Sequence, residues 1–267
     1  MRLLRVVAAA LVLAPSAFAL QGRIVEDSIP TRALDGRLSF DVYLPPGYDG
    51  ATTRYPTLYY LHGLPARPGA FRSFGYVVSA LESTGRRAIV VAPQGAHDGD
   101  TDPEYLDWGP GREWESAIAD ELVRAIDHRY RTLARRSARA IVGVSAGGYG
   151  AAIIGLHHLD EFGAIESWSG YFHPTDPTGT RALAREPEAT ATNLIADLQS
   201  TPAFLGFYVG AADSRFRGDN VLFARALSRA RLPFTFAMYP GGHTQTLWAA
   251  QAPGWLSLAL EHLDPPS

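Results

Sequence analysis

The sequence contains neither cysteine nor lysine. Without cysteine the chain has no disulfide, no thiol nucleophile and no thiolate ligand for zinc or an iron–sulfur cluster. Its 24 basic side chains are all arginines, spread singly or in pairs, and 27 acidic residues bring the formal net charge to −3. A slightly acidic chain with no basic patch lacks the positive surface that binds nucleic acid, so we expect no nucleic-acid partner.

The chain also lacks an apolar run of the roughly 20 residues that a membrane-spanning helix requires. The apolar segment from Val6 to Ala14 is shorter; two arginines precede it, and Pro15 and an Ala-x-Ala site ending at Ala19 follow it. This order is typical of a secretory signal peptide. We therefore expect residues 1–19 to be a signal peptide cleaved after Ala19. The product is then secreted, or held in the periplasm or cell envelope, without a stable membrane anchor; a buried N-terminal strand is the alternative.

Short apolar runs alternate with helical patterns along residues 20–267, which contain no repeat or linker and are expected to form one domain. A hairpin is predicted over 23–43, around a turn at 34–37. Later runs of strand length are 57–61, 88–92, 139–143, 204–209 and 234–238, and helical patterns fall at 71–81, 114–130, 220–229 and 246–263, the last interrupted near Pro253. Strands that are apolar throughout are covered on both faces. The alternation therefore predicts an α/β fold with a mostly parallel central sheet and helices on both faces.

The segment Gly143-Val144-Ser145-Ala146-Gly147 is a G-x-S-x-G motif between an apolar strand and a stretch rich in alanine and isoleucine. A sharp strand-to-helix turn holds the central serine in strained backbone angles and crowds the positions two residues away, where only glycine fits. The turn exposes the serine hydroxyl, and the N-terminus of the following helix favours developing negative charge. Ser145 is therefore the candidate nucleophile, and a glycine-rich turn with an incidental serine is the alternative.

A serine hydroxyl needs a general base, and the base needs a third group to orient it. In folds with this motif the acid and the histidine follow the serine in that order. Asp213 and His243 each come soon after a predicted strand, at the end of the sheet where α/β proteins place their sites, so they are the candidate acid and base. His173 is the reserve base, and a surface histidine is the alternative for either. Asp219 is expected to cap the helix that begins near Asn220.

Two backbone N–H groups are needed to bind the oxyanion that forms during attack on an ester. One is expected from Ala146, next to the nucleophile. The other is expected from Leu64, in the loop after strand 57–61, because the following Pro65 has no N–H. His62 in the same loop is interpreted as a brace for the loop rather than as a base or a metal ligand.

The loops 93–113 and 171–202 are expected to border the site and to decide the substrate. They carry Trp108, Tyr171 and Phe172, which are candidates for an aromatic substrate-binding wall. Ordinary core aromatics are an equally good interpretation of the same residues.

Acidic residues stand at alternate positions from Asp98 to Asp102 and again at Glu104. A calcium-binding loop of the EF-hand type needs glycine at its sixth position and glutamate at its twelfth, which are Pro103 and Gly109 here. We therefore expect a solvated acidic loop, and we expect neither a metal site nor a cofactor.

Short motifs are distributed along the chain from about residue 25 to residue 260. They are Val42-Tyr43-Leu44-Pro45, Leu61-His62-Gly63, Trp114-Glu115, Gly143 to Gly148, Gly210 to Asp213 and Gly241-Gly242-His243. As a set they resemble the esterase-D-like putative esterase family of α/β-hydrolases, which includes feruloyl esterases, S-formylglutathione hydrolases and secreted mycolyltransferases. The resemblance implies an α/β-hydrolase fold and a triad of Ser145, Asp213 and His243, with Leu64 and Ala146 supplying the oxyanion hole.

The secreted mycolyltransferases are similar to this chain around Asp107-Trp108 and Trp114-Glu115. They carry an aspartate and an arginine for trehalose where this chain has His62 and Pro65, and these departures favour hydrolysis over transfer to trehalose. We expect a secreted serine carboxylesterase that hydrolyses small-molecule or glycan esters through an acyl-enzyme on Ser145. An acyltransferase using the same residues, or a non-catalytic binding protein that retains the fold, is the alternative.

Overall fold

The computed structural model describes residues 20–65, 69–97, 105–174 and 189–267. They form an eight-stranded sheet with the strand order β1-β2-β4-β3-β5-β6-β7-β8. The strands are β1 (Arg23–Thr31), β2 (Gly36–Leu44), β3 (Thr57–Leu61), β4 (Ile89–Pro93), β5 (Arg139–Val144), β6 (Ala164–Trp168), β7 (Phe204–Gly210) and β8 (Thr235–Tyr239). β2 is antiparallel to both β1 and β4, and all the other neighbours are parallel. The expected mostly parallel sheet is therefore confirmed.

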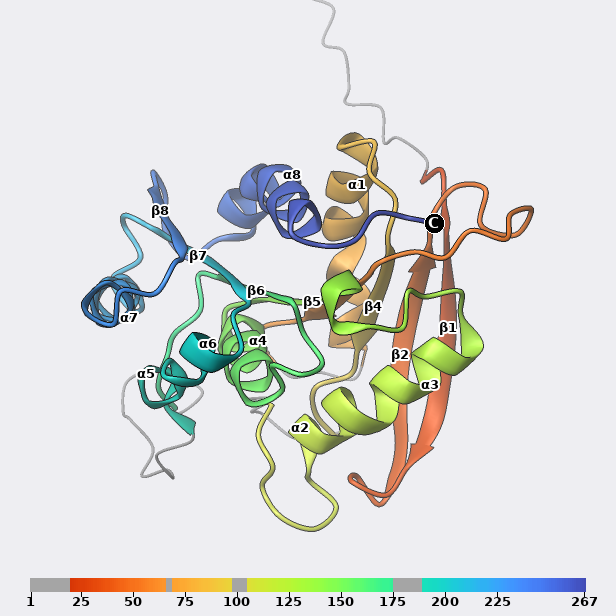
Figure 1. Cartoon of the computed structure of the whole chain (residues 1–267), viewed down its shortest axis with the longest axis horizontal. Helices are drawn as coiled ribbons and strands as arrows, with labels where there is room; N and C mark the ends of the chain where they lie inside the picture. Colours follow the sequence, from red (N-terminus) through yellow and green to blue (C-terminus); the bar gives the residue numbers. More distant parts are fainter. Residues whose placement is uncertain (1–19, 66–68, 98–104, 175–188) are drawn as a thin grey trace, which may run out of the picture.

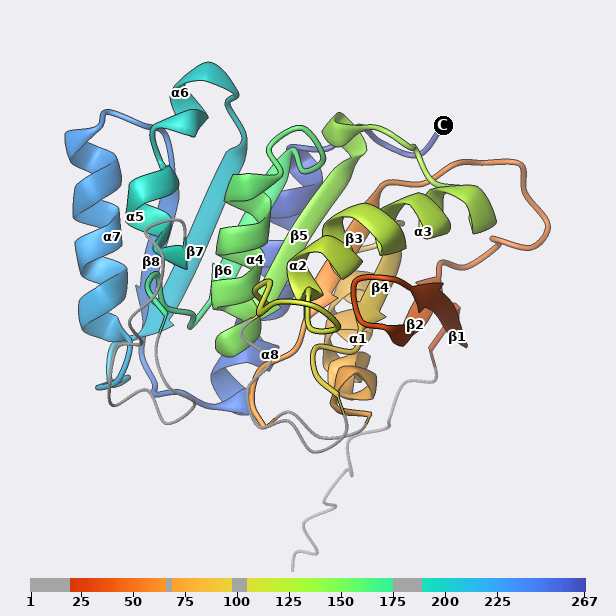
Figure 2. The same cartoon turned by 90° about the horizontal axis from the view of Figure 1, so that it is seen from below.

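Helices cover both faces of this sheet (Figure 1). On one face lie α1 (Gly75–Ser83) and α8 (Gln245–Glu261). On the other lie α2 (Trp114–Ser116), α3 (Val123–Arg129), α4 (Ala146–His157), α5 (Ala191–Leu194), α6 (Asp197–Ser200) and α7 (Arg217–Arg229). Figure 2 shows this second face, with α7, α4 and α3 in front of the strands. Short segments complete the fold: η1 (Ala70–Phe74) leads into α1, the π-helical η2 (Ala117–Leu122) joins α2 to α3, and η3 (Arg136–Ala138) precedes β5.

The central strands are buried on both faces. Every residue of β3, β4, β5 and β6 is buried. Their side chains alternate between two hydrophobic cores, as Ile141 and Val142 illustrate: the first packs on the α4 face and the second on the α1–α8 face. This is why these strands appear in the sequence as continuous apolar runs rather than as alternating patterns.

One strand was not predicted from the sequence. β6 contains Glu166 and Ser167 in its centre, and these polar residues interrupt the apolar run that would identify it. Both are fully buried. The indole N–H of Trp168 donates to the Glu166 carboxyl at 2.9 Å. Burial raises the pKa of Glu166 well above its ordinary value, although the bond from Trp168 acts in the opposite direction, and this shift favours the uncharged carboxylic acid that a core position tolerates.

The predicted break near Pro253 is wrong, because α8 is one continuous helix with this proline inside it. Proline removes one backbone donor from a helix, and in isolation that would favour a break. Here the residues on either side of it, Ala252, Trp255 and Leu256, are buried against the sheet. Packing of this apolar face stabilises the helix despite the missing bond.

Two expectations concern residues that the structure does not describe. They are the signal peptide over residues 1–19 and the acidic positions from Asp98 to Glu104. Among the helices within the described ranges, none combines the length and the apolar character needed to cross a bilayer.

Candidate active site

Ser145 occupies the turn between β5 and α4 with φ 57° and ψ −121°, a backbone conformation that side-chain-bearing residues rarely adopt. Its N–H donates to the carbonyl of Trp168 in β6 at 2.9 Å. A Cβ atom on Gly143 would lie 2.0 Å from the carbonyl oxygen of Gly147, and one on Gly147 would lie 2.0 Å from that of Leu61. The two motif glycines are therefore required by close backbone approach, as the sequence predicts.

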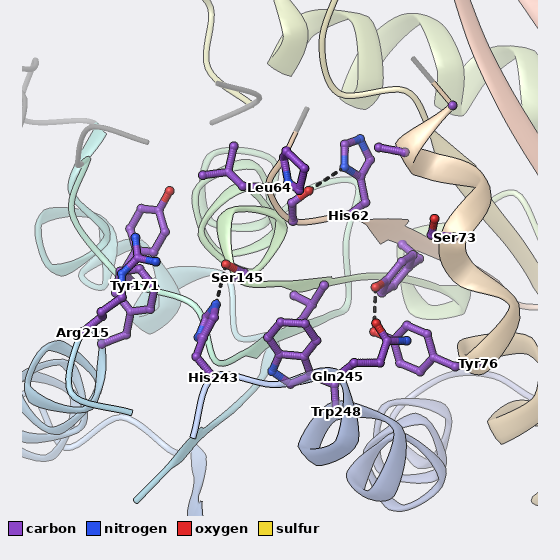
Figure 3. Close-up of a pocket in the computed structure, with 17 residues that line it drawn as sticks. His62, Leu64, Ser73, Tyr76, Ser145, Tyr171, Arg215, His243, Gln245 and Trp248 are labelled. Carbon is purple, nitrogen blue, oxygen red and sulfur yellow. Dashed lines mark hydrogen bonds between the residues drawn. The ribbon is translucent and has the colours of Figure 1, made fainter. Parts of the chain in front are cut away.

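The ends of β5, β7 and β8 bring Ser145, Asp213 and His243 together; the first and the last are labelled in Figure 3. His243 Nε2 lies 2.8 Å from Ser145 Oγ, and His243 Nδ1 lies 2.8 Å from Asp213 Oδ2. An ionised carboxylate can only accept, so the neutral imidazole carries its proton on Nδ1 and donates it to Asp213. Nε2 is then left to accept a hydrogen bond from the serine hydroxyl.

Asp213 is held as a carboxylate by its neighbours. Its side chain is 1% exposed. Burial alone would raise its pKa, but the hydrogen bond from His243 and those from the backbone N–H groups of Phe216 and Arg215 outweigh burial and keep the pKa below its ordinary value. A charged Asp213 fixes the tautomer of the histidine and would stabilise an imidazolium formed during proton transfer.

The loops that carry the acid and the base are fastened to each other. The N–H of Ala211 donates to the carbonyl of Tyr239, and the N–H of Ala212 donates to that of Gly241, each at 2.8 Å. A Cβ atom on Gly210 would lie 2.5 Å from the Gly241 carbonyl oxygen, so the two loops approach at backbone contact. This contact sets the distance between Asp213 and the histidine loop.

A second carboxylate–imidazole pair lies nearby and does not involve the serine. His173 Nδ1 is 2.9 Å from Asp219 Oδ1, and this bond raises the pKa of His173. The other carboxylate oxygen of Asp219 accepts from the backbone N–H of Phe172. The expectation that Asp219 caps a helix is wrong: α7 begins at Arg217, and the carboxylate instead anchors the segment after β6. The structure thus places His243, and not His173, next to Ser145.

The loop after β3 passes directly beside the nucleophile. A Cβ atom on Gly63 would lie 2.9 Å from the Cβ atom of Ser145, and Leu64 follows in the wall above the serine (Figure 3). Ala146 is the first residue of α4, so its N–H has no acceptor within the helix. Within the described part of the chain, neither the Leu64 N–H nor the Ala146 N–H donates to a backbone carbonyl. Leu64 and Ala146 thus lie beside Ser145 with their N–H groups free of backbone acceptors among the described residues, and their role in an oxyanion hole stays a prediction.

A cavity of about 530 Å³ opens in front of Ser145 and His243. Figure 3 shows its walls: the loop with Leu64 lies on one side, Tyr171 and Arg215 lie beside the histidine, and Trp248 and Tyr76 lie beyond it. The lining combines aromatic rings and small apolar residues with a few polar side chains, among them Ser73, Arg215 and Gln245. Such a pocket suits a small ester with an apolar part and a few hydrogen-bonding groups.

The three aromatic residues proposed for substrate binding have different positions. Tyr171 lines the cavity. Phe172 does not, because its ring is 1% exposed and stacks on Phe223 with a centroid distance of 3.8 Å. Trp108 packs against the hydrophobic core and is not among the cavity-lining residues. For Phe172 and Trp108 the structure therefore agrees with core packing.

Two further aromatic rings contact the candidate base. The ring of Trp248 meets the His243 imidazole edge-on at 5.0 Å, and the ring of Phe216 lies 5.2 Å away on another side. Both residues line the cavity. The sequence could not identify them, because their place depends on how α8 and the loop before α7 fold back onto the histidine loop.

The described residues contain no candidate metal site. Among them, no three His, Cys, Asp or Glu side chains come together in a way that could hold a metal ion.

Comparison with protein families gives one match over most of the chain. Residues 31–257 match a family described as "Putative esterase". A Mycobacterium tuberculosis protein named as an esterase is 32% identical over 141 residues, which are 52% of this chain and 30% of that protein. The chain thus aligns with less than a third of the length of this curated relative.

Comparison with solved structures shows the same fold. A ferulic acid esterase superimposes with a TM-score of 0.76 at 23% identity, covering 92% of this chain and 100% of that one. An S-formylglutathione hydrolase from Agrobacterium tumefaciens gives 0.74 at 22% identity, covering 92% and 97%. A fluorophosphonate-binding serine hydrolase from Staphylococcus aureus gives 0.75 at 19% identity, covering 90% and 98%. At these identities the likeness concerns the fold alone.

Proposed function

The chain belongs to the putative esterase family, and on this basis we propose that it hydrolyses carboxylic esters through an acyl-enzyme on Ser145. One observation carries the proposal: the continuous hydrogen-bond path from Ser145 Oγ through His243 to Asp213, with 2.8 Å at each step. A nucleophile, a base and an orienting acid in this geometry perform acyl transfer on several unrelated folds.

In the proposed first step, Ser145 Oγ attacks the ester carbonyl carbon while His243 Nε2 takes the hydroxyl proton. The carbonyl π electrons move to the oxygen, which becomes an oxyanion facing the N–H groups of Leu64 and Ala146. Loss of one such donor typically costs about 10²–10³ in kcat, so the two together are a large part of the expected rate enhancement.

Collapse of this intermediate breaks the bond to the leaving alcohol. His243 returns the proton to the alcohol oxygen, and the acyl group stays on Ser145 Oγ as an ester. Water then attacks the acyl carbon while His243 takes its proton; the bond between the acyl carbon and Ser145 Oγ breaks, His243 returns the proton to Oγ, and the carboxylic acid leaves. Asp213 remains a carboxylate throughout and stabilises the imidazolium between the two proton transfers.

We further propose that the substrate is a small-molecule or glycan ester of modest size. The cavity of about 530 Å³ is in the range of pockets that enclose small ligands. A ferulic acid esterase and an S-formylglutathione hydrolase share the fold, which makes aromatic acyl esters and thioesters reasonable first substrates to test beside simple acetyl and butyryl esters.

The catalytic proposal is tested by replacing Ser145 with alanine and measuring hydrolysis of p-nitrophenyl acetate and butyrate. Loss of the nucleophile should lower kcat by at least about 10³-fold, since only the oxyanion hole and binding remain. Ser169→Ala is the matched control, because this serine is also buried and also has a positive φ, of 49°. It follows Trp168, whose carbonyl accepts from the Ser145 N–H, but it is Ser145 that pairs with His243 Nε2. Full activity of the Ser145→Ala enzyme would refute the proposal.

We also propose that residues 1–19 direct export and are removed after Ala19, leaving residues 20–267 as one catalytic domain. The support is the signal-like order of the sequence, and the residues directly after it belong to the fold: Leu20 packs on the α1–α8 core, and the N–H groups of Gln21 and Gly22 both donate to Glu82 Oε1 at 2.8 Å. Expression of the whole chain in a bacterium, followed by N-terminal sequencing of the exported fraction, should give Leu20 as the first residue. An intact N-terminus on active cytoplasmic enzyme would contradict this.

A further inference from the structure

Tyr105 follows β4 and inserts its ring into a slot beneath the candidate oxyanion loop. The residue is fully buried and has a positive φ of 60°. A Cβ atom on Gly150 of α4 would lie 2.4 Å from the ring, and one on Gly95 would lie 2.6 Å from it. Two glycines therefore make room for this ring, one after β4 and one in the helix that follows the nucleophile.

The hydroxyl of Tyr105 reaches the end of β3. It donates to the main-chain carbonyl of His62 at 2.8 Å. The rings of Tyr105 and His62 meet edge to face at 5.9 Å. The contact joins segments 43 residues apart, so it ties the loop after β4 to the loop after β3.

The side chain of His62 makes the next contact in the same loop. His62 Nδ1 lies 2.9 Å from the carbonyl oxygen of Gly63 (Figure 3). A carbonyl can only accept, so Nδ1 carries the proton and donates it. The residue is 7% exposed, and burial lowers the pKa of the imidazole, so the ring is neutral at pH 7.

These two bonds act on consecutive peptide groups. The Gly63 carbonyl and the Leu64 N–H belong to one planar peptide unit, in which a trans arrangement points the two groups in opposite directions. Holding the Gly63 carbonyl therefore sets the direction of the Leu64 N–H. A hydrogen bond accepted by the carbonyl also polarises the unit and strengthens its N–H as a donor.

We propose that Tyr105 and His62 are positioning residues that hold and polarise the Leu64 N–H donor of the oxyanion hole. Tyr105 fixes the His62 carbonyl, and the His62 ring fixes the Gly63 carbonyl, so the Leu64 N–H is aimed before substrate arrives. Neither side chain needs to touch the reacting atoms. The inference rests on the proposed esterase function and adds the way in which one half of the oxyanion hole is built.

The test compares Tyr105→Phe with Tyr149→Phe. Each variant removes one buried hydroxyl that donates to a backbone carbonyl, at 2.8 Å for Tyr105 and 2.7 Å for Tyr149; the acceptor of Tyr105 is His62 at the start of the oxyanion loop, whereas that of Tyr149 is Ala189. Tyr105→Phe should lower kcat about tenfold with little change in KM, since misdirecting a donor costs less than the 10²–10³-fold of removing it. Tyr149→Phe should lose similar thermal stability and keep its kcat.

A second pair of variants tests whether the hydrogen bond from the His62 side chain matters, rather than the bulk of its imidazole ring. His62→Asn keeps a side-chain N–H that can reach the Gly63 carbonyl, whereas His62→Leu has none. We expect Asn to retain most of the activity and Leu to lose at least about tenfold in kcat, by the same reasoning on the oxyanion donor.

The decisive readout is the affinity for a trifluoromethyl ketone, which forms an oxyanion-bearing adduct with the active serine. Across Tyr105→Phe, His62→Asn and His62→Leu, the inhibition constant should rise in proportion to the fall in kcat/KM. The proposal is overturned if Tyr105→Phe and His62→Leu keep wild-type affinity for the inhibitor, or if Tyr149→Phe loses as much affinity as Tyr105→Phe. Retained activity in Ser145→Ala would instead refute the esterase mechanism itself, so the two failures can be told apart.

Discussion

At the scale of single residues, the candidate site depends on which of two aspartates serves the nucleophile. Asp213 and Asp219 are six positions apart, and each pairs with the Nδ1 atom of a histidine, at 2.8 and 2.9 Å. Only His243 continues the path to Ser145. The second pair, with His173, anchors the chain after β6. The two carboxylates therefore make the same kind of hydrogen bond to a histidine but have different roles.

Because the two aspartate–histidine pairs are so similar, the same substitution can be compared in both. Asp213→Asn should lower kcat by about 10³–10⁴-fold with KM nearly unchanged, because the amide favours the wrong imidazole tautomer. Asp219→Asn should change kcat by no more than a few fold. Steady-state kinetics on one p-nitrophenyl ester decides between them, and equal losses in both variants would show that the role assigned to Asp213 is not specific.

The three candidate residues that the structure brings into hydrogen-bond contact could be predicted from the sequence, because each lies soon after an apolar strand, in the chain order that the G-x-S-x-G turn requires. The role of Asp219 could not be predicted in this way. A helix-capping pattern is a local signal, whereas the backbone N–H that Asp219 accepts belongs to Phe172, 47 residues earlier. The place of Tyr105 could not be predicted either, since nothing in the sequence shows that its hydroxyl reaches the carbonyl of His62.

At the scale of elements, the turn from β5 into α4 is where the backbone has the least freedom. Gly147→Ala would place a methyl group 2.0 Å from the carbonyl oxygen of Leu61, and a main-chain atom cannot move aside cheaply. We expect this variant to lose about 4 kcal/mol or more of unfolding free energy, or to fail to fold.

Gly254 is the matched control for this substitution. It lies in the interior of α8, is exposed, and a Cβ atom on it would meet nothing within 4 Å. Gly254→Ala should therefore stabilise the protein by about 0.5–1 kcal/mol, the usual gain from replacing glycine inside a helix. Urea denaturation measures both variants; a Gly147→Ala protein as stable as wild type would contradict the close approach.

The positions of strands and helices could be predicted from the sequence where an uninterrupted hydrophobic pattern determines them. β3 and β5 begin at the predicted residues because their apolar runs are uninterrupted. β6 was missed because Glu166 and Ser167 are polar, and α8 was given a break because Pro253 lowers local helix propensity. In both cases tertiary burial overrides the local pattern, which a single sequence does not display.

At the scale of the whole molecule, a buried ionic cluster joins the start of α2 to the end of α4. Glu115 Oε1 lies 2.7 Å from His157 Nδ1 and 3.1 Å from His158 Nε2, and its side chain is 12% exposed. Burial raises the pKa of Glu115, but the bonds with the two histidines outweigh burial and leave it below its ordinary value. For His158 burial acts to lower the pKa, but the hydrogen bond with Glu115 outweighs burial and leaves the pKa above its ordinary value.

These opposite shifts define a pH window for stability. The lowered pKa of Glu115 contributes stability above the ordinary value of 4.5, and that contribution is lost as the pH falls through the lowered pKa. The raised pKa of His158 contributes fully below the ordinary value of 6.5 and is lost as the pH rises through the raised pKa. The cluster therefore stabilises the fold most between these two ordinary values.

Glu115→Gln tests this window. The variant should be less stable than wild type by about 2 kcal/mol near pH 5.5, the usual value for a lost charge-assisted hydrogen bond, and the difference should shrink near pH 9. Glu113→Gln, two residues earlier, should show no such pH dependence. Denaturation curves at the two pH values provide the measurement, and a difference that grows toward pH 9 would contradict the assigned shifts.

The sheet as a whole explains why one edge carries the site. The candidate residues follow β3, β5, β7 and β8, which are all parallel, so their carboxyl ends meet on the same side of the molecule. The mostly parallel sheet was predictable from the alternation of apolar runs and helices. The outline of the cavity was not, because its walls come from Trp248, Arg215 and Tyr76, whose places depend on loops and helices from separate parts of the chain.

The central claim is that Ser145 becomes covalently acylated, and the most direct measurement is to locate the modified residue. The folded enzyme is labelled with a fluorophosphonate, digested and mapped by mass spectrometry, with Ser145→Ala and heat-unfolded wild type as controls. We expect one adduct, on the peptide containing Ser145, and none in either control. Ester hydrolysis by a protein that is unlabelled, or labelled at a residue other than Ser145, would contradict it.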